Sequence, residues 1–238
     1  MTVRVDVISD VICPWCFVAK RRMDKAIATF AGTSDIDIDV TWHPFELNPD
    51  MPKDGMDRKV YRSQKFGSWE RSLALDAQVA RAGKDDGIAF AHARAERTPN
   101  TFDAHRLLWL AQQKGVQDRV AEALFRGYFI EGVDVGRREE LVTIARDAGL
   151  DAEETRLFLD SDGGAAEVRA EEVEHRLMGV SGVPLIIVNG TAVISGAQRP
   201  DTFLAAFEEA VREETRRAAD TVPIAAGGVC ALDGTGQC

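Results

Sequence analysis

Two cysteines separated by two residues constrain this chain more than any other feature. Cys13-Pro14-Trp15-Cys16 follows a β-rich opening at residues 2–8 and precedes an amphipathic run. Pro14 suits the first helical turn, because that turn has no partner for its N–H group. Cys13 then lies at or beside the N-cap, where the helix dipole and the free N–H groups favour thiolate over thiol. Cys16, one turn later, can attack a mixed disulfide formed on Cys13. The motif predicts a redox centre.

The same C-x-x-C spacing is also half of a zinc site, and Cys230 and Cys238 could supply the other half. A static structural disulfide and a chance pair of buried cysteines are the remaining alternatives. Structural zinc sites usually combine two tight pairs in short loops, whereas the second pair here is spaced C-x7-C. The pattern therefore favours redox chemistry, and we expect no metal ligand.

The composition is that of an ordinary globular protein. A chain of 238 residues with 45% apolar and 29% charged side chains can form one large domain, or a domain with a sizeable insertion. The net charge of −10 argues against nucleic acid or an anionic membrane as partner. No signal-peptide pattern precedes the motif, so we expect a cytoplasmic protein. In that compartment the four cysteines are more often catalytic, sensing or metal-binding than a passive disulfide framework.

Hydrophobic periodicity divides the chain into two β-containing parts with a helical block between them. Neither β-containing part has enough strands to close a core alone, so we expect both to join in one mixed sheet. The elements expected outside the block are a strand at 2–8, a helix at 13–30, strands at 35–42, 183–188 and 191–195, and a helix from residue 200. Asn189-Gly190, between the last two strands, is the strongest short hairpin signal.

This order predicts three parts. Residues 1–55 and 179–217 form an α/β core, and residues 56–178 form a helical insertion packed over the sheet. Residues 218–238 form a flexible C-terminal tail that is rich in small residues and carries the second cysteine pair. Within the insertion, the charged run Glu167–Glu174 is expected to be a solvated helix face.

A proline at the entrance of the strand at 183–188 adds a second half to the predicted site. In Gly182-Val183-Pro184, a cis Val183–Pro184 bond would bring this loop against the dithiol. The Val183 backbone would then be free to pair with a substrate chain. The alternative is an ordinary trans proline at a strand edge, but the combination with the dithiol favours cis.

These features resemble the thioredoxin superfamily, within it the DsbA-like branch with a helical insertion, and most of all its FrnE-like group. The matching segments reach to about residue 215, and are Asp10–Cys16, Pro44–Pro49, Asn100–Arg106 and Gly182–Pro184. The resemblance implies an α/β fold, with a thioredoxin-like mixed sheet and a large all-helical insertion. It also implies a disulfide oxidoreductase or isomerase, with Cys13 as attacking thiol, Cys16 as resolving thiol and Pro184 cis.

In the expected mechanism, the Cys13 thiolate attacks a substrate disulfide. Resolution by Cys16 gives reduction, and resolution by a substrate thiol gives isomerisation. The expected partners are disulfide-containing or unfolded proteins and a small-thiol or thioredoxin-type reductant, with no nucleic acid and no membrane. We expect no cofactor besides the redox-active disulfide, with glutathione as a candidate co-substrate. Trp15 either contacts apolar substrate segments or packs over the helix end.

Four further residues carry hypotheses. Cys230 and Cys238 could swing toward the dithiol as a second redox pair that relays electrons, or they could be a surface disulfide or two thiols without a role. Glu46 is a candidate buried proton acceptor for Cys16, since related folds place a carboxylate under the dithiol. A solvated loop residue is the alternative for Glu46. His105, on a helix with apolar neighbours, is expected to be a hydrogen-bonded core histidine.

The closest rival function is a glutathione-dependent enzyme. The chain also resembles the kappa glutathione transferases and the 2-hydroxychromene-2-carboxylate isomerases, which typically carry serine where Cys13 stands. That function predicts small-molecule turnover that survives Cys16→Ser. A four-cysteine zinc-binding module would hold stoichiometric metal, and a thiol-dependent holdase chaperone would act independently of its redox state.

Overall fold

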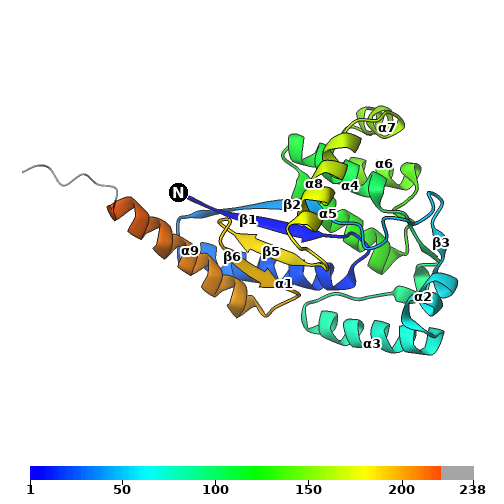
Figure 1. Cartoon of the computed structure of the whole chain (residues 1–238), viewed down its shortest axis with the longest axis horizontal. Helices are drawn as coiled ribbons and strands as arrows, with labels where there is room; N and C mark the ends of the chain where they lie inside the picture. Colours follow the sequence, from blue (N-terminus) through cyan, green and yellow to red (C-terminus); the bar gives the residue numbers. More distant parts are fainter. Residues whose placement is uncertain (221–238) are drawn as a thin grey trace, which may run out of the picture.

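The computed structural model describes residues 1–220, in the order β-α-β, insertion, β-β-α (Figure 1). The predictions for Cys230 and Cys238, and for nearly all of the tail, lie outside the described residues. The core elements are β1 (Thr2–Ser9), α1 (Pro14–Ala31), β2 (Asp37–Pro44), β5 (Leu185–Val188), β6 (Ala192–Ser195) and α9 (Pro200–Asp220).

One four-stranded sheet joins the two β-containing parts of the chain, in the order β2-β1-β5-β6. β1 pairs parallel with β2 and antiparallel with β5, so that Val7 lies opposite both Trp42 and Ile186. Alternate residues of β1 enter the core, and Val3, Val5 and Val7 are at most 1% exposed. The prediction of a single mixed sheet is confirmed.

The Asn189-Gly190 turn connects β5 and β6 as predicted. Both residues have positive φ, 48° and 71°, which Asn and Gly tolerate best, and the Thr191 N–H closes the turn on the Val188 carbonyl at 3.1 Å. The turn is also tied to β1, because the Asn189 side chain accepts from the Arg4 N–H at 2.8 Å and the Asn189 N–H donates to the Arg4 carbonyl at 2.9 Å.

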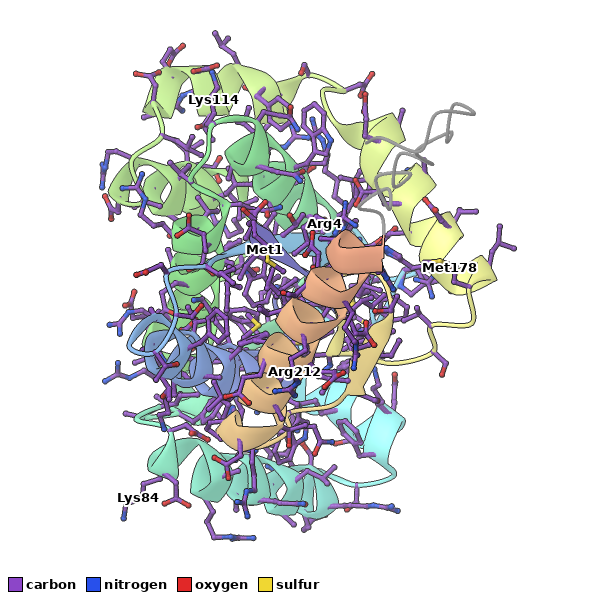
Figure 2. All side chains as sticks on the ribbon, turned by 90° about the vertical axis from the view of Figure 1, so that its left-hand side faces the viewer. Met1, Arg4, Lys84, Lys114, Met178 and Arg212 are labelled. Atoms are coloured by element: carbon purple, nitrogen blue, oxygen red, sulfur yellow. The ribbon has the colours of Figure 1, made fainter. Side chains whose placement is uncertain are left out.

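Helices cover both faces of the sheet (Figures 1 and 2). α1 and α9 pack against each other on one face, where the rings of Phe30 and Phe207 meet edge to face with centroids 6.0 Å apart. α8 lies on the other face and contacts β2. The rest of the insertion gathers at the end of the molecule opposite the C-terminal end of α9 (Figure 1).

The insertion shares its core with the sheet and α1, since Phe125 meets Trp42 of β2 edge to face at 5.8 Å and stacks on Phe17 of α1 at 5.3 Å between centroids. It is not purely helical, because Met56–Asp57 and Arg97–Thr98 form a short antiparallel pair. The predicted limits at residues 56 and 178 stay predictions. Its elements are β3 (Met56–Asp57), α2 (Arg58–Phe66), α3 (Trp69–Asp85), η1 (His92–Arg94), β4 (Arg97–Thr98), α4 (Phe102–Gln113), α5 (Gln117–Arg126), the π-helical turn η2 (Gly127–Glu131), α6 (Arg138–Asp147), α7 (Ala152–Asp160) and α8 (Ala165–Leu177).

The prediction that the charged run on α8 is a solvated face is wrong for one residue. Glu172 is only 6% exposed, because α8 packs on β2, and its Oε1 accepts the backbone N–H of Glu46 at 2.9 Å. Glu171 reaches the same strand, with its Oε2 3.0 Å from His43 Nδ1. Across residues 1–220, no helix combines the length and apolar character needed to cross a membrane.

Candidate active site

α1 begins where the motif predicts, with Cys13 as N-cap in an extended conformation (φ −86°, ψ 111°) and Pro14 as first residue. The N–H groups of Cys16 and Phe17 donate to the Cys13 carbonyl at 3.0 and 3.4 Å. Both cysteines carry free thiols in the described chain, with Cys13 5% exposed and Cys16 fully buried. Cys13 is therefore the outer sulfur and Cys16 lies behind it.

The Val183–Pro184 bond is cis, as predicted. The loop lies against the dithiol, with the Cys13 Sγ 3.6 Å from the Val183 carbonyl oxygen. The Gly196 N–H donates to the Pro184 carbonyl at 2.9 Å and so holds the entrance of β5 beside the end of β6. A groove of about 380 Å³ follows this loop, lined by residues 178–185 together with Ser195 and Gly196. The structure thus brings Cys13, Val183 and Pro184 together.

Trp15 is half-buried and packs against the core. The core therefore covers part of its surface, and its contact with substrate stays a prediction.

Cys16 is held in its thiol form. Burial raises the pKa of the Cys16 thiol well above its ordinary value, and the hydrogen bond and charge of Cys13 raise it further. The backbone N–H of Asp10 acts in the opposite direction, whereas the Asp10 charge adds to the rise. A base must therefore take the proton before Cys16 can act as a nucleophile.

Asp10 is the carboxylate that acts on Cys16, and it was not among the predicted site residues. Its side chain is fully buried at the end of β1, where Oδ1 accepts the N–H of Ile12 at 3.2 Å and Oδ2 accepts the N–H of Leu47 at 2.8 Å. Its carbonyl accepts the Cys13 N–H at 2.9 Å. Asp10 therefore joins the start of α1 to the loop that follows β2.

Glu46 is buried, at 3% exposure, and the alternative of a solvated loop residue is wrong. Its neighbours are nevertheless other ionisable groups. Burial and the Glu172 carboxylate raise the pKa of Glu46 to about 7. The charge of His105 lowers this pKa, and the charge of Asp10 raises it. The Arg176 guanidinium donates to the Glu46 carbonyl at 3.0 Å. A part of Glu46 in proton transfer to Cys16 stays a prediction.

His105 of α4 completes this group. It is 2% exposed, with Nε2 3.8 Å from Asp10 Oδ1, a distance for an ion pair rather than a hydrogen bond. The expected burial is confirmed, but neither ring nitrogen has a hydrogen-bond partner within residues 1–220. Burial disfavours the imidazolium, yet Asp10, Glu172 and Glu46 together raise the pKa of His105 above its ordinary value. The segments carrying Asp10, Glu46 and His105 are all among those that show the family resemblance.

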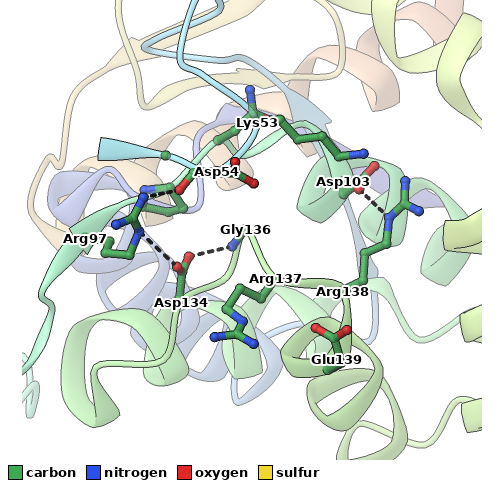
Figure 3. A pocket seen from close by; sticks show the side chains of 12 residues that line it. Lys53, Asp54, Arg97, Asp103, Asp134, Gly136, Arg137, Arg138 and Glu139 are labelled. Atoms are coloured by element: carbon green, nitrogen blue, oxygen red, sulfur yellow. Dashed lines mark hydrogen bonds and ion pairs between the residues drawn. The ribbon is translucent and has the colours of Figure 1, made fainter. Parts of the chain in front are cut away.

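In residues 1–220, no group of three or more His, Cys, Asp or Glu side chains could hold a metal ion, and a zinc site completed by Cys230 and Cys238 falls outside that range. A cleft of about 560 Å³ opens between the loop after β2 and the start of α6 (Figure 3). Two ion pairs line it, Arg97 with Asp134 at 3.7 Å and Arg138 with Asp103 at 2.9 Å. This cleft contains neither thiol, and we assign it no step.

A dithiol at a helix start, facing a cis-proline at a strand entrance, defines a thioredoxin-like fold and site. The chain matches the model of the DSBA-like thioredoxin domain over residues 4–208, and it belongs to this family. It is similar to the crystal structure of a probable DsbA oxidoreductase from Streptomyces coelicolor, with 36% sequence identity and a TM-score of 0.80 over 89% of this chain and 91% of that one.

Two further relatives are more distant. The uncharacterized protein YwbO of Bacillus subtilis is 28% identical over 223 residues, which are 91% of this chain and the whole of that protein. The cytosolic disulfide reductase DsbM from Pseudomonas aeruginosa, at 19% identity and a TM-score of 0.58 over 88% and 99% of the two chains, shows likeness of fold alone. The predicted thioredoxin-like α/β fold and DsbA-like family are confirmed.

Proposed function

We propose that this protein is a thiol–disulfide oxidoreductase that acts on protein disulfides through Cys13 and Cys16. The observation that carries the proposal is the position of the Cys13 sulfur, at a helix N-cap and 3.6 Å from the Val183 carbonyl, with Cys16 buried one turn behind it. Membership of the DSBA-like family supports the oxidoreductase class.

In the first step, the Cys13 thiolate attacks one sulfur of a substrate disulfide. The substrate S–S bond breaks, a Cys13–substrate disulfide forms, and the second substrate sulfur leaves as a thiolate that takes a proton from water. The N-terminus of α1 stabilises the Cys13 thiolate. The Val183 backbone pairs with the substrate as an added strand and orients its disulfide toward Cys13.

In the second step, Cys16 loses its proton and attacks the Cys13 sulfur. The mixed disulfide breaks, the substrate leaves as its second thiol, and Cys13 and Cys16 form a disulfide, so two electrons pass to the substrate. When a substrate thiol attacks instead, disulfides rearrange without net electron transfer, which is isomerisation. A small thiol or a thioredoxin-type reductant returns the electrons, with glutathione as a candidate co-substrate, and no other cofactor enters.

An apolar surface beside the cis-proline loop supports unfolded or disulfide-containing proteins as partners. Val173, Leu177 and Met178, along the outer side of α8 and its end, are 57%, 83% and 59% exposed. Figure 2 shows Met178 at the periphery of the molecule. Exposed apolar side chains grouped in this way are typical of a contact surface for other proteins.

The proposal includes two further parts. We place the protein in the cytoplasm, where a reducing environment would keep the dithiol reduced and ready to attack. We also propose that Cys230 and Cys238, which lie outside the described residues, exchange disulfides with Cys13 and Cys16 as a relay.

The test combines dithiothreitol-driven insulin reduction with refolding of a protein that carries scrambled disulfides. Wild type should be active and Cys13→Ser inactive in both assays. A Cys230→Ser/Cys238→Ser double variant should turn over more slowly if the relay operates, and unaltered turnover would refute the relay alone. A wild type that is inactive in both assays would overturn the oxidoreductase function, and glutathione conjugation and bound zinc would then be measured.

A further inference from the structure

The strand β2 lies at one edge of the four-stranded sheet, and part of its outer side has no neighbouring strand (Figure 1). At Trp42 the Gln117 side chain takes the place of such a strand, because it binds both the N–H and the carbonyl of Trp42. Residues two and four positions earlier in a strand direct their backbone groups to the same side. Ile38 and Val40 therefore direct their N–H and carbonyl groups outward.

The hydrogen bonds to β1 agree with this direction. The N–H of Phe45, directly after β2, donates to the Ser9 carbonyl at 3.0 Å, so the residues of β2 with odd numbers face β1. Within residues 1–220, the outward backbone groups of Ile38 and Val40 have no hydrogen-bond partner. Unpaired groups on a strand edge can accept a strand from another chain.

A groove of about 680 Å³ lies along this edge. One wall is formed by residues 38–41 of β2, and the others by the last two turns of α1, the end of α4 and the start of α5. Ile27, Ile38 and Val40 give it an apolar lining that packs on the core, and Ala28 and Ala31 are small. The unpaired backbone groups thus lie beside a space that can hold side chains.

The charged residues that line the groove are all acidic, namely Asp24, Asp39 and Asp118. The buried Lys20 pairs with two of them, with Asp24 at 3.1 Å and with Asp118 at 3.0 Å. One ammonium group is therefore shared by two carboxylates, and Asp39 is exposed beside them.

Two arginines near the groove do not neutralise it. Arg21 lies no closer to Asp24 than 3.9 Å and binds Glu122 more closely. Arg4 lies opposite Asp39, but in β1, on the side of β2 that faces away from the groove. The groove therefore favours an occupant with positive charge.

Charge also decides between the chains that could pair with this edge. A second copy of β2 in antiparallel pairing would bring Asp37 and Asp39 of both copies together, and like charges on adjoining strands are unfavourable. Residues 221–238 of this chain include Asp233 and neither Lys nor Arg, so they offer no complementary charge. A basic segment of another protein meets both requirements, a free backbone edge and opposite charge.

We propose that the groove beside β2 is a docking site for an extended, basic segment of a partner protein, which adds to the sheet as a further strand. The backbone of the segment binds Ile38 and Val40, and the pairing ends at Trp42. Side chains of a strand alternate between the two faces of a sheet. Apolar side chains of the segment therefore pack on Ile27, and Lys or Arg side chains on the other face reach Asp39.

This site is separate from the dithiol. Ile27 lies almost four turns after Cys13 in α1, which corresponds to roughly 20 Å along the helix axis. A partner bound in the groove leaves Cys13 accessible, so the groove can anchor a protein while the thiol reacts. The inference does not depend on the proposed function, and either can fail without the other.

The test uses the full chain and fluorescein-labelled peptides of seven residues, in which lysine alternates with valine, isoleucine or threonine. The peptides contain no cysteine and cannot react with Cys13. Fluorescence anisotropy at low ionic strength measures binding, and hydrogen exchange of the Ile38 and Val40 amides, followed by NMR, locates it. Two matched peptides separate charge from strand pairing. One carries glutamate for lysine, and the other alternates lysine with proline, which keeps the charge but cannot pair as a strand.

The lysine peptides should bind and slow the exchange of both amides, whereas neither matched peptide should do so. Asp39→Lys should weaken binding by roughly 5- to 30-fold, as expected when an exposed ion pair becomes a repulsion. Val40→Pro should also weaken binding with all charges kept, because it removes an outward N–H and no hydrogen bond to β1. Asp162→Lys, at an exposed position before α8, is the matched charge control and should bind as wild type does.

Three results would overturn the proposal. The first is that no lysine peptide binds to wild type. The second is that the lysine–proline peptide binds as tightly as the others, or that exchange of Ile38 and Val40 is unchanged, since charge alone would then attract the peptides. The third is slow exchange of both amides in the free protein, because the edge would already be paired. A dependence on protein concentration would then identify a second copy as the occupant, and its absence would identify this chain itself.

Discussion

Cys13 and Val183 lie 170 positions apart in the sequence, yet the cysteine sulfur is 3.6 Å from the valine carbonyl oxygen. A polypeptide that pairs with the cis-proline loop would therefore bring its disulfide to the outer thiol of the motif. Cys16, fully buried, is accessible only to the sulfur of Cys13 and not to a bulky substrate. This arrangement assigns different roles to two chemically identical side chains.

Cys16→Ser should convert the protein into a trap. Attack by Cys13 remains, but the resolving thiol is lost, so a mixed disulfide with glutathione should accumulate after treatment with oxidised glutathione. Intact-mass spectrometry measures the adduct, and peptide mapping should place it on Cys13. The matched variant Cys13→Ser should form no adduct in the motif. Equal modification of Cys16 in that variant would contradict the assignment of the outer thiol.

Glu46 should make stability depend on pH. Its pKa of about 7 lies above the ordinary value of 4.5, so the folded state binds more protons than the unfolded state between these values, and the free energy of unfolding falls as pH rises through that window. Glu46→Gln removes this titration. Relative to wild type, the free energy of unfolding of the variant should rise by on the order of 3 kcal/mol from pH 4 to pH 8. Urea unfolding of both proteins at the two pH values measures this difference, and a difference that is the same at both pH values would contradict the expectation.

His43 should change stability with pH in the same sense as Glu46, through the contact between α8 and β2. Burial lowers the pKa of His43, but hydrogen bonds to Glu171 and Asp6, each 3.0 Å long, raise it above 6.5 overall. A raised histidine pKa contributes stability below pH 6.5, and the contribution is lost as pH rises through the folded-state value. His43→Gln should therefore cost roughly 1–2 kcal/mol at pH 5.5 and much less at pH 9.

The control for this change is His92→Gln in the insertion, since burial lowers the pKa of His92 to about 4. A lowered histidine pKa makes stability rise, not fall, with increasing pH, so removing His92 should not weaken the protein selectively at pH 5.5. Urea unfolding of both variants at pH 5.5 and 9 makes the comparison. A His43→Gln penalty that is equal at the two pH values would show that its imidazolium does not hold α8.

Gln117 protects the outer edge of the sheet. β2 is one of the two edge strands of the four-stranded sheet, and the Gln117 side chain binds the N–H and the carbonyl of Trp42 at 2.9 and 2.8 Å, as a neighbouring strand would. Gln117→Leu should leave both buried backbone groups unpaired and cost roughly 2–4 kcal/mol of unfolding free energy. Urea unfolding measures the loss. Gln113→Leu, at an exposed position of α4, should change stability by less than about 0.5 kcal/mol.

Much of the fold was predictable because its signals are local. The Asn189-Gly190 turn requires positive φ at two consecutive residues, and Pro14 after Cys13 suits the first turn of a helix. Period-two and helical patterns extend over many residues of the core elements. The pair of Met56–Asp57 with Arg97–Thr98 could not be predicted, since two residues are too few to establish a period.

The charge environment of the dithiol, in contrast, does not depend on local signals and could not be predicted from them. Glu172 belongs to a run of charged residues that any periodicity analysis assigns to solvent, and it is buried because α8 packs on β2. Glu46 could be proposed as a buried carboxylate only by analogy. The carboxylate whose charge raises the pKa of Cys16 is Asp10, and Asp10 pairs with His105 of α4.

The sequence by itself determined where the two thiols lie, that Cys13 caps a helix, and that a proline enters the strand at Leu185. These properties depend on residues adjacent in the chain, whose backbone geometry and capping act over one helical turn. Only the tertiary structure decided which buried groups surround Cys16, because desolvation and Coulomb interactions depend on distance in space. The N-cap position of Cys13 thus follows from four consecutive residues, whereas the pKa of Cys16 is raised by its burial in the folded core and by the neighbouring Cys13 and Asp10 charge.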